Sequence, residues 1–265
     1  MKVLAVQGSP HQGNTHHRVE RLGEILVGLG DMEFEHIALK DVNLKGCLGC
    51  FRCFAHGEDS CPLNDDRAMI ADKMDEADAL VFATPVYSMQ VSYLLKRFVD
   101  RFAYNFHRPR FFDKYAVGLA VAGAVGLKDT LRYIETFSEL WGFEYAAGLK
   151  YVDPPRESNI PRLIKPKDRT ERVARKLHRL LKLNPPRRLS FRDHLTFHTQ
   201  RTAYARMEAY SPADYAYWKT KGWLDPDCRY FTDHARVGLV KNLVARLVAG
   251  AMGKVMDRRL SNDRD

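Results

Sequence analysis

Four cysteines lie close together in the chain and form its most distinctive group of side chains. Cys47, Cys50, Cys53 and Cys61 follow the spacing C-x2-C-x2-C-x7-C, which uses four of the five cysteines in the sequence. Thiolates crowded in this way are typical ligands of an iron–sulfur cluster. The spacing therefore predicts an inorganic centre held by one loop of the chain.

Two other uses of these thiols stay open. Zinc sites with four cysteines are normally built from two C-x2-C pairs about a dozen or more residues apart, and no second, distant pair is present here. Free or redox-active thiols are the other alternative. Disulfides are disfavoured, because nothing in the sequence suggests an oxidising compartment.

The chain as a whole is long enough for one substantial core and an appendage. It has 265 residues, 45% of them hydrophobic. The sequence shows neither a secretory signal nor an uncharged apolar stretch of the length that a membrane-spanning helix needs. We therefore expect a cytoplasmic protein without a transmembrane segment, in a reducing setting that suits cysteine ligands.

The net charge of +9 is unevenly distributed. Residues 156–210 hold 15 Lys and Arg against 5 Asp and Glu. Such a segment can attract nucleic acid, anionic lipid or an acidic protein such as a ferredoxin, although its simplest interpretation is a solvated surface. No basic and aromatic recognition motif accompanies it, so we expect no nucleic-acid partner.

Alternating apolar and amphipathic segments predict five β-α units in the first part of the chain. A parallel, doubly wound sheet with helices on both faces follows from that alternation. In the strand order 2-1-3-4-5, the ends of the first and third strands adjoin the point where the order reverses, which is where such sheets bind ligands. The predicted strands cover residues 2–6, 34–39, 79–83, 115–121 and 143–152.

Three loops at predicted strand ends have the composition of ligand sites. Residues 8–15 combine glycines with Ser9, Asn14 and Thr15 before a helix start, which suits an anion. The loop matches neither the Walker pattern nor the dinucleotide pattern. Residues 84–89 contain Tyr87, whose flat ring suits a planar aromatic ligand. Residues 122–126 are small, which permits close approach of a ligand.

A helical extension follows the sheet domain. Pro185 and Pro186 mark the break, which gives a domain of residues 1–184, with a cysteine-rich loop at 43–66, and an extension of residues 185–265. We expect its aromatic side chains to pack onto the sheet domain and Cys228 to be a small buried residue. An apolar stripe in residues 237–256 suits a membrane surface, but packing against the domain or a second subunit is the preferred interpretation.

Together, these features resemble a known family. Gly8-Ser9-Pro10 with Gly13-Asn14-Thr15, the four-cysteine run, Asp65-Asp66 and Thr84-Pro85-Val86-Tyr87 occur in that order. This pattern resembles the NAD(P)H-dependent FMN reductases of the flavodoxin-like fold, and more narrowly the iron–sulfur flavoproteins. The resemblance covers residues 1–183.

The resemblance implies that FMN binds without a covalent bond. The phosphate would be held by Ser9, Gln12, Asn14 and Thr15. The isoalloxazine ring would be flanked by Pro85, Val86, Tyr87, Ser88 and Met89. Gly123 would lie near the ring, although the family usually has a Gly-Gly element where this chain has Ala122-Gly123-Ala124.

The resemblance also implies a 4Fe–4S cluster on Cys47, Cys50, Cys53 and Cys61, and a homodimer or homotetramer. The expected function is an FMN-dependent oxidoreductase that exchanges electrons with NAD(P)H, a quinone or a ferredoxin. Because FMN and the cluster carry the chemistry, no catalytic proton-transfer residue is assigned. The alternatives are a cluster-free NAD(P)H-dependent FMN or quinone reductase and a non-catalytic electron carrier.

Overall fold

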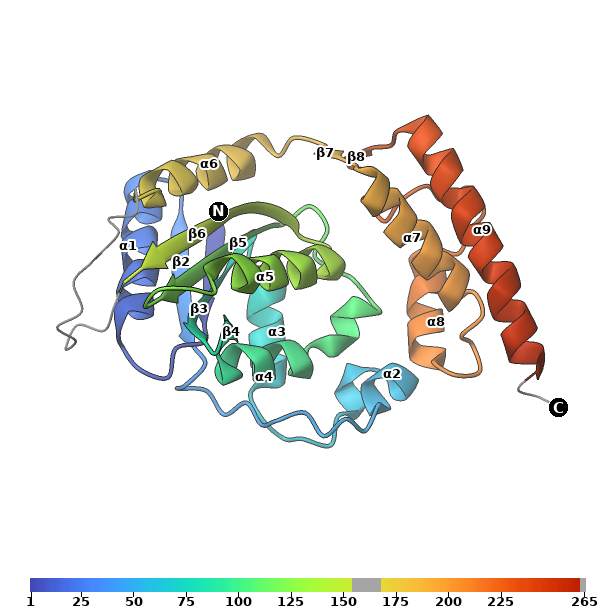
Figure 1. Cartoon of the computed structure of the whole chain (residues 1–265), viewed down its shortest axis with the longest axis horizontal. Helices are drawn as coiled ribbons and strands as arrows, with labels where there is room; N and C mark the ends of the chain where they lie inside the picture. Colours follow the sequence, from blue (N-terminus) through green and yellow to red (C-terminus); the bar gives the residue numbers. More distant parts are fainter. Residues whose placement is uncertain (154–167, 263–265) are drawn as a thin grey trace. The chain divides into compact units, whose positions relative to one another are not determined.

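The computed structural model describes residues 1–153 and 168–262 (Figure 1). They divide into two compact units. Unit 1 comprises Met1–Gly49 and Leu63–Pro185, and unit 2 comprises Cys50–Pro62 and Pro186–Asp265. The segment that carries three of the four clustered cysteines is therefore part of the same unit as the C-terminal helices.

Unit 1 contains a parallel sheet of the order β2-β1-β3-β5-β6, with the short β4 antiparallel to β3. Without β4, this is the order 2-1-3-4-5 that the sequence predicts, and the flavodoxin-like fold class is confirmed. The strands are β1 (Lys2–Gln7), β2 (Glu33–Ala38), β3 (Ala79–Tyr87), β4 (Gln90–Val91), β5 (Tyr115–Ala122) and β6 (Glu144–Val152).

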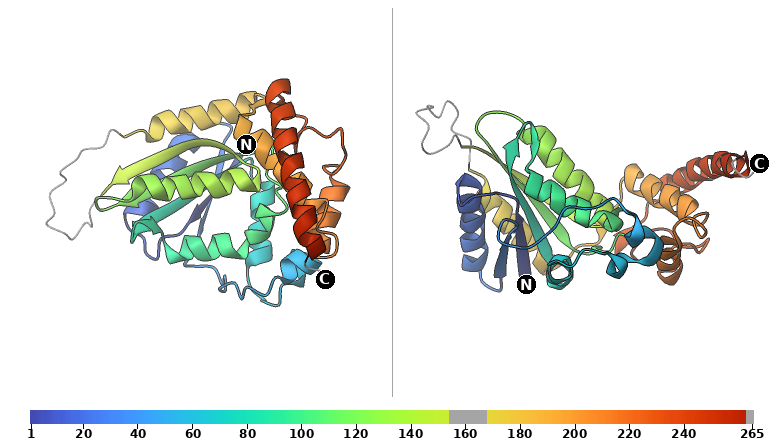
Figure 2. Two further views of the ribbon diagram at one scale, coloured as in Figure 1. Left: turned by 45° about the vertical axis from the view of Figure 1, so that its right-hand side comes forward. Right: turned by 90° about the horizontal axis from the view of Figure 1, so that it is seen from below.

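Helices cover both faces of this sheet (Figures 1 and 2). One face carries α1 and α6, and the other carries α3, α4 and α5. The helical segments of unit 1 are α1 (Asn14–Gly28), α3 (Arg67–Glu76), α4 (Tyr93–Arg101), η2 (Ala103–Phe106), α5 (Leu127–Trp141) and α6 (Thr170–Leu183).

Alternating strand residues supply the two cores. Val3 and Val81 point to the side of α1 and α6, where they join Leu22, Leu26 and Leu177 in one buried cluster. On the other side an aromatic cluster surrounds the buried ring of Phe82. Its ring centroid lies 4.9–6.3 Å from those of Phe98, Phe137, Trp141 and Phe143. Burial on both faces explains why the sequence of β3 is almost continuously apolar.

Unit 2 is built around aromatic side chains. Its elements are α2 (Arg52–His56), η1 (Glu58–Ser60), β7 (Arg187–Arg188), α7 (Phe191–Tyr204), α8 (Pro212–Thr220), β8 (Ala235–Arg236) and α9 (Leu239–Asn262). Phe197 and Trp218 are fully buried, and Tyr204 stacks on Trp218 with ring centroids 4.9 Å apart. The C-terminal aromatics thus pack on one another inside their own unit, whereas the sequence suggests packing onto the sheet domain. Ser190 and Asp193 start α7 with a capping box.

The apolar stripe of α9 is not covered within its own unit. Val240, Leu243 and Leu247 are more than half exposed in this structure, whereas Ala245 and Ala249 are buried. The side of α9 that faces α7 has little room for large side chains: an added Cβ on Gly253 would lie 2.8 Å from Thr202 Cγ2 of α7. Small residues allow close helix approach, so they, and not the large apolar ones, face α7.

Candidate functional site

The first candidate loop connects β1 to α1. Ser9 is fully buried, and its Oγ donates to the carbonyl oxygen of His11 at 2.7 Å, which closes the turn. Thr15 is also buried, in the first turn of α1. Because the N-cap residue is Gly13, no side chain caps this helix start. Its first-turn N–H groups have no intrahelical acceptors, which suits a phosphate.

Asn14 and α1 also anchor the far end of the sheet. Asn14 Nδ2 donates to the carbonyl oxygen of Asp153 at 3.2 Å. The guanidinium of Arg18 donates to both carboxylate oxygens of Asp153, at 2.8 and 3.0 Å, and lies 4.3 Å from the ring centroid of Tyr151. These contacts fix the direction of α1 and hold Asn14 at the helix start.

Gly8 ties the first loop to the third strand. Its N–H donates to Ala83 O at 2.8 Å, and its carbonyl accepts a hydrogen bond from Ser92 Oγ. The Ser92 N–H in turn donates to Thr84 Oγ1 at 3.0 Å. A Cβ on Gly8 would lie 2.7 Å from Leu95 Cβ, so only glycine fits here. The ends of β1 and β3 are therefore held together by the start of α4.

The second candidate loop is a two-residue hairpin turn between β3 and β4. Val86 pairs with Val91 and Tyr87 with Gln90, which leaves Ser88 and Met89 as the turn. Both have positive φ angles, 48° and 69°. Two consecutive left-handed residues form a type I′ turn, for which Asn-Gly is the preferred sequence. Ser88-Met89 is a strained choice, and such strain is typical of functional loops.

The double substitution Ser88→Asn with Met89→Gly should separate stability from function. We expect the free energy of unfolding to rise by about 1–2 kcal/mol, because the strain of two left-handed residues is relieved. The expected cost is weaker flavin binding, because the Met89 side chain is lost. Chemical denaturation and a flavin titration measure the two effects. Met89→Ala, which loses the side chain but keeps the strain, is the matched control. An unchanged free energy of unfolding in the double variant would show that the turn at Ser88 and Met89 is not strained.

The third candidate loop, after β5, contacts this turn. Gly126 has a φ angle of 90°, and a Cβ there would lie 2.7 Å from Val86 Cγ1 and 3.1 Å from Met89 Cα. Gly123 is exposed, with nothing within 4 Å of an added Cβ. The β5–α5 loop thus packs on the β3–β4 turn and leaves open space beside Gly123.

Exposed apolar side chains gather on these loops. Pro85 is buried and Val86 is half-buried, but Tyr87 and Met89 are 41% and 51% exposed, and Val125 is 66% exposed. Burial, and more weakly Tyr93, raises the pKa of Tyr87, so its hydroxyl stays protonated near neutral pH. An uncapped helix start for a phosphate and an apolar, aromatic surface for a planar ring fit FMN. The structure thus brings the predicted phosphate and ring loops to one edge of the sheet.

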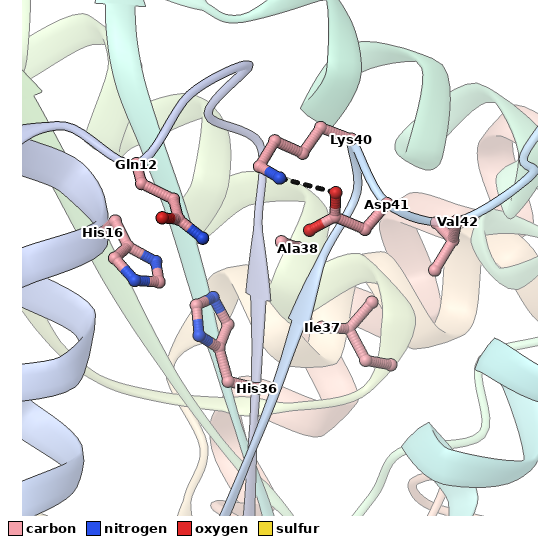
Figure 3. A pocket seen from close by; sticks show the side chains of 8 residues that line it. All are labelled: Gln12, His16, His36, Ile37, Ala38, Lys40, Asp41 and Val42. Atoms are coloured by element: carbon pink, nitrogen blue, oxygen red, sulfur yellow. Dashed lines mark hydrogen bonds and ion pairs between the residues drawn. The ribbon is translucent and has the colours of Figure 1, made fainter.

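A pocket of about 300 Å³ opens beside the first loop (Figure 3). Gln12, predicted to contact the phosphate, is exposed and lines this pocket together with His16, His36 and Lys40. The imidazoles of His16 and His36 face one another, with ring centroids 5.3 Å apart and the Gln12 amide beside them. His16 Nε2 lies 2.9 Å from the Glu20 carboxylate. Sequence reasoning missed His36, since nothing in β2 distinguishes it.

His36 should make the protein acid-sensitive. Burial, and then the neighbouring His16, lowers the pKa of His36. The unfolded chain therefore binds the proton of His36 more tightly than the folded chain does. The contribution of neutral His36 to the free energy of unfolding is complete above the unfolded-state pKa of about 6.5, and it is lost as the pH falls below that value. We expect His36→Gln to lose less stability between pH 7.5 and 5.5 than the wild type does, measured by denaturant titration. The half-exposed His17→Gln is the control, and an equal loss in both variants would contradict this role.

The ends of the cysteine-bearing loop are fixed within unit 1 by two aspartates. Asp66 accepts a hydrogen bond from the Asn43 N–H at 2.7 Å, and Asp65 accepts one from the Lys45 N–H at 2.9 Å. The fully buried Asp65 carboxylate also pairs with Arg101 Nη2 at 2.8 Å. The Asp65-Asp66 motif therefore closes the loop, in addition to its favourable charge at the start of α3.

The cysteines themselves are accessible thiols. Cys47 and Cys50 are exposed, Cys53 and Cys61 are half-buried, and none is in a disulfide. Among the described residues, no three His, Cys, Asp or Glu side chains are gathered as a metal site. The donor set itself, four thiols in C-x2-C-x2-C-x7-C order, fits an iron–sulfur cluster. Cys228, predicted to be a small buried residue, is separate from them and half-buried, and burial raises the pKa of its thiol.

Other parts of unit 2 hold the segment Cys50–Pro62 in place. The short helix α2 packs on α8, and Ser211 Oγ, next to the start of α8, donates to Phe54 O at 3.1 Å. Ser60 Oγ lies 2.6 Å from Gly57 O and closes the turn before Cys61. The sequence signal of Ser211-Pro212 indicates only a helix start, so this link to Phe54 was not foreseeable.

Comparison with known proteins assigns the family. Residues 1–140 match the family described as NADPH-dependent FMN reductase. The chain belongs to this family. As a family member it is a flavin-dependent oxidoreductase. The matched range includes all three candidate loops and the four cysteines.

Several relatives of this chain carry a narrower name. A protein of Archaeoglobus fulgidus named iron-sulfur flavoprotein is 29% identical over 233 residues, which cover 84% of this chain and all of the relative. A second one from the same organism is 41% identical over 38% of this chain and 48% of its own length. One of Methanocaldococcus jannaschii is 40% identical over 38% of this chain and 51% of the relative. The latter two matches thus span about half of each relative.

Solved structures share the fold at low sequence identity. RosB with a bound riboflavin-5′-phosphate derivative aligns with a TM-score of 0.55 at 14% identity, over 69% of this chain and 79% of that one. A flavone reductase aligns with a TM-score of 0.50 at 17% identity, over 69% of this chain and 63% of that one. These two structural matches support the α/β fold described above for this chain.

In the part of the chain that the structure describes, no helix has the length and apolar character needed to cross a membrane.

Proposed function

We propose that the protein is an FMN-containing oxidoreductase that passes electrons between NAD(P)H or a reduced carrier, FMN, and a 4Fe–4S cluster on Cys47, Cys50, Cys53 and Cys61. One observation carries the flavin part: the loops after β1, β3 and β5 are joined at one edge of the sheet by the contacts of Gly8 and Gly126. That edge presents both an uncapped helix start and exposed apolar side chains.

The first loop would hold the phosphate of FMN. Its donors are the N–H groups of the first turn of α1 and the side chains of Asn14, Thr15 and Gln12. Because a phosphate carries negative charge, the positive end of the α1 dipole stabilises it as well. The buried Ser9 acts mainly by shaping the turn, since its hydroxyl donates to His11 O.

The turn after β3 and the loop after β5 would hold the ring. Tyr87 and Met89 offer flat or polarizable apolar surface, and the open space beside Gly123 lets the backbone approach the ligand. Pro85 and Val86 fix the base of this turn, with Ser88 at its tip. FMN supplies the redox chemistry when bound, because it accepts two electrons together as hydride and releases them singly. The chain's own residues bind and orient it.

The cluster part of the proposal depends on the cysteine set. Its support is the compact spacing, the accessible thiols, and the name of the relatives in Archaeoglobus fulgidus and Methanocaldococcus jannaschii. A cluster would accept electrons one at a time. The alternative is a cluster-free NAD(P)H-dependent FMN or quinone reductase, which the description of the matched family also fits.

Anaerobic mixing of the FMN-loaded protein with NADPH or NADH tests the enzyme function. We expect the flavin absorption to bleach within the time of turnover, and a quinone to restore it. Bleaching only by reduced ferredoxin, with a strong dependence on salt, would instead show a non-catalytic electron carrier.

The exposed apolar surface of Tyr87, Met89 and Val125 also supports a homodimer or homotetramer with flavin sites near its interfaces. Light scattering of the FMN-loaded protein measures this oligomeric state.

A further inference from the structure

Helix α9 has two unlike faces. One face packs on α7 through small or polar residues: Ala245 and Ala249 are buried, and Asn242 Oδ1 lies 2.5 Å from His198 Nε2 of α7. Arg206, just after α7, binds the Asp257 carboxylate at 2.6 and 2.9 Å. This face already has its partner, and the packing fixes which side of α9 points away from α7.

The opposite face is an unbroken apolar stripe. Its seven large side chains recur at the helical spacing i, i+3, i+4, i+7 and i+8, and all are at least 41% exposed. They are Val240, Leu243, Val244, Leu247, Val248, Met252 and Val255. At 1.5 Å per residue the stripe is about 22 Å long. Nothing in unit 2 covers these described residues, although an exposed contiguous apolar surface normally marks an interaction site.

Basic residues border the α9 stripe. Lys241, Arg246 and Lys254 are exposed, and Arg258 and Arg259 follow. Between residues 239 and 262 the sequence contains one acidic residue, Asp257, which is paired with Arg206. An apolar face flanked by Lys and Arg is the arrangement of helices that lie in the surface of an anionic membrane.

A second copy of the chain fits this face less well. A strip about 22 Å long and about 10 Å wide, the breadth of one helix, offers far less than the roughly 800 Å² per partner of a standard protein interface. Pairing two copies of the stripe would also bring their basic borders together, whereas anionic lipid headgroups would neutralise them.

We propose that the α9 stripe docks the protein onto anionic membrane surfaces, with the seven apolar side chains among the lipid acyl chains and the bordering Lys and Arg at the headgroups. The helix lies along the surface and does not cross the membrane. Unit 2 thereby becomes a peripheral membrane anchor. This inference stands on the exposed stripe and its charges, and it does not depend on the flavin or on the cysteines.

Sedimentation of the full-length, FMN-loaded protein with lipid vesicles tests the proposal. We expect the wild type to sediment with vesicles of equal parts phosphatidylcholine and phosphatidylglycerol, and about tenfold less with phosphatidylcholine alone. Leu243→Gln with Leu247→Gln should reduce binding to the mixed vesicles at least about tenfold, since two leucines leave the lipid. Because both side chains are exposed, the thermal midpoint and the flavin content should stay at wild-type values.

Matched variants separate the contributions. Lys241→Gln with Arg246→Gln should weaken binding to the mixed vesicles only, whereas Val27→Gln, the same kind of change at an exposed site on α1, should leave binding unchanged. Wild-type binding by the Leu243→Gln, Leu247→Gln variant would overturn the proposal. Absence of vesicle binding by the wild type would overturn it as well. In that case, a halved solution mass of the leucine variant would indicate that a second copy covers the stripe. A lowered thermal midpoint of that variant would indicate that another part of the same chain covers it.

Discussion

Asn14→Asp is expected to lower the affinity for FMN on the order of 100-fold, which corresponds to about 2.7 kcal/mol. Asn14 is the first residue of α1, where no side chain caps the helix. A carboxylate there would face the phosphate and repel it, and would itself accept the N–H hydrogen bonds that the phosphate needs. The same charge is favourable for the helix, so the unfolding midpoint should not fall by a comparable amount.

The charge and the lost amide can be told apart. Asn14→Ser also removes the hydrogen bond to Asp153 O but adds no charge and keeps a small polar group at the helix start. We expect its affinity for FMN to stay within about tenfold of the wild type, or 1.4 kcal/mol. Fluorescence quenching of FMN during titration into apoprotein measures both variants. Equal affinities of wild type and Asn14→Asp would show that the phosphate binds elsewhere.

Replacing Cys47, Cys50, Cys53 and Cys61 together by serine is expected to abolish iron and sulfide binding while one FMN per chain remains. Serine keeps the size of the side chain but does not supply the thiolates that bind iron. The flavin loops are held by contacts of Gly8, Ser92 and Gly126 that involve no cysteine. Iron, sulfide and flavin analyses after anaerobic purification give the three quantities.

Cys228→Ser is the matched control for this experiment. It removes the remaining cysteine, whose thiol pKa is raised by burial, and should leave the iron content unchanged. Loss of flavin together with iron in the four-cysteine variant would contradict the independence of the two sites. A wild-type protein without iron but with rapid NAD(P)H oxidation would identify the cluster-free reductase.

The sheet and its helices could be predicted from the sequence because their patterns are locally strong. Continuous apolar runs such as Leu80–Ala83 leave few alternatives to a buried parallel strand, and β3 contains that run. The order of the strands then follows from topology, and with it the edge at which the three ligand loops meet.

Features that depend on contacts distant in sequence could not be predicted. The strand continuing through Pro85 to Tyr87 and pairing with β4 has no local signal, because Ser88-Met89 is an unusual type I′ sequence. The association of Cys50–Pro62 with the C-terminal helices depends on links such as that between Ser211 and Phe54. For α9, periodicity shows an apolar stripe but cannot show that the small residues, and not the stripe, face α7.

The central claim, that the loops after β1, β3 and β5 form an FMN site, is tested most directly by reconstitution. Protein purified without added flavin would be incubated with FMN, freed of excess ligand, and analysed for bound flavin by its visible absorption and by quantification after release. We expect one FMN per chain in the wild type and a large reduction in Asn14→Asp. A colourless wild-type protein that takes up no FMN would contradict it.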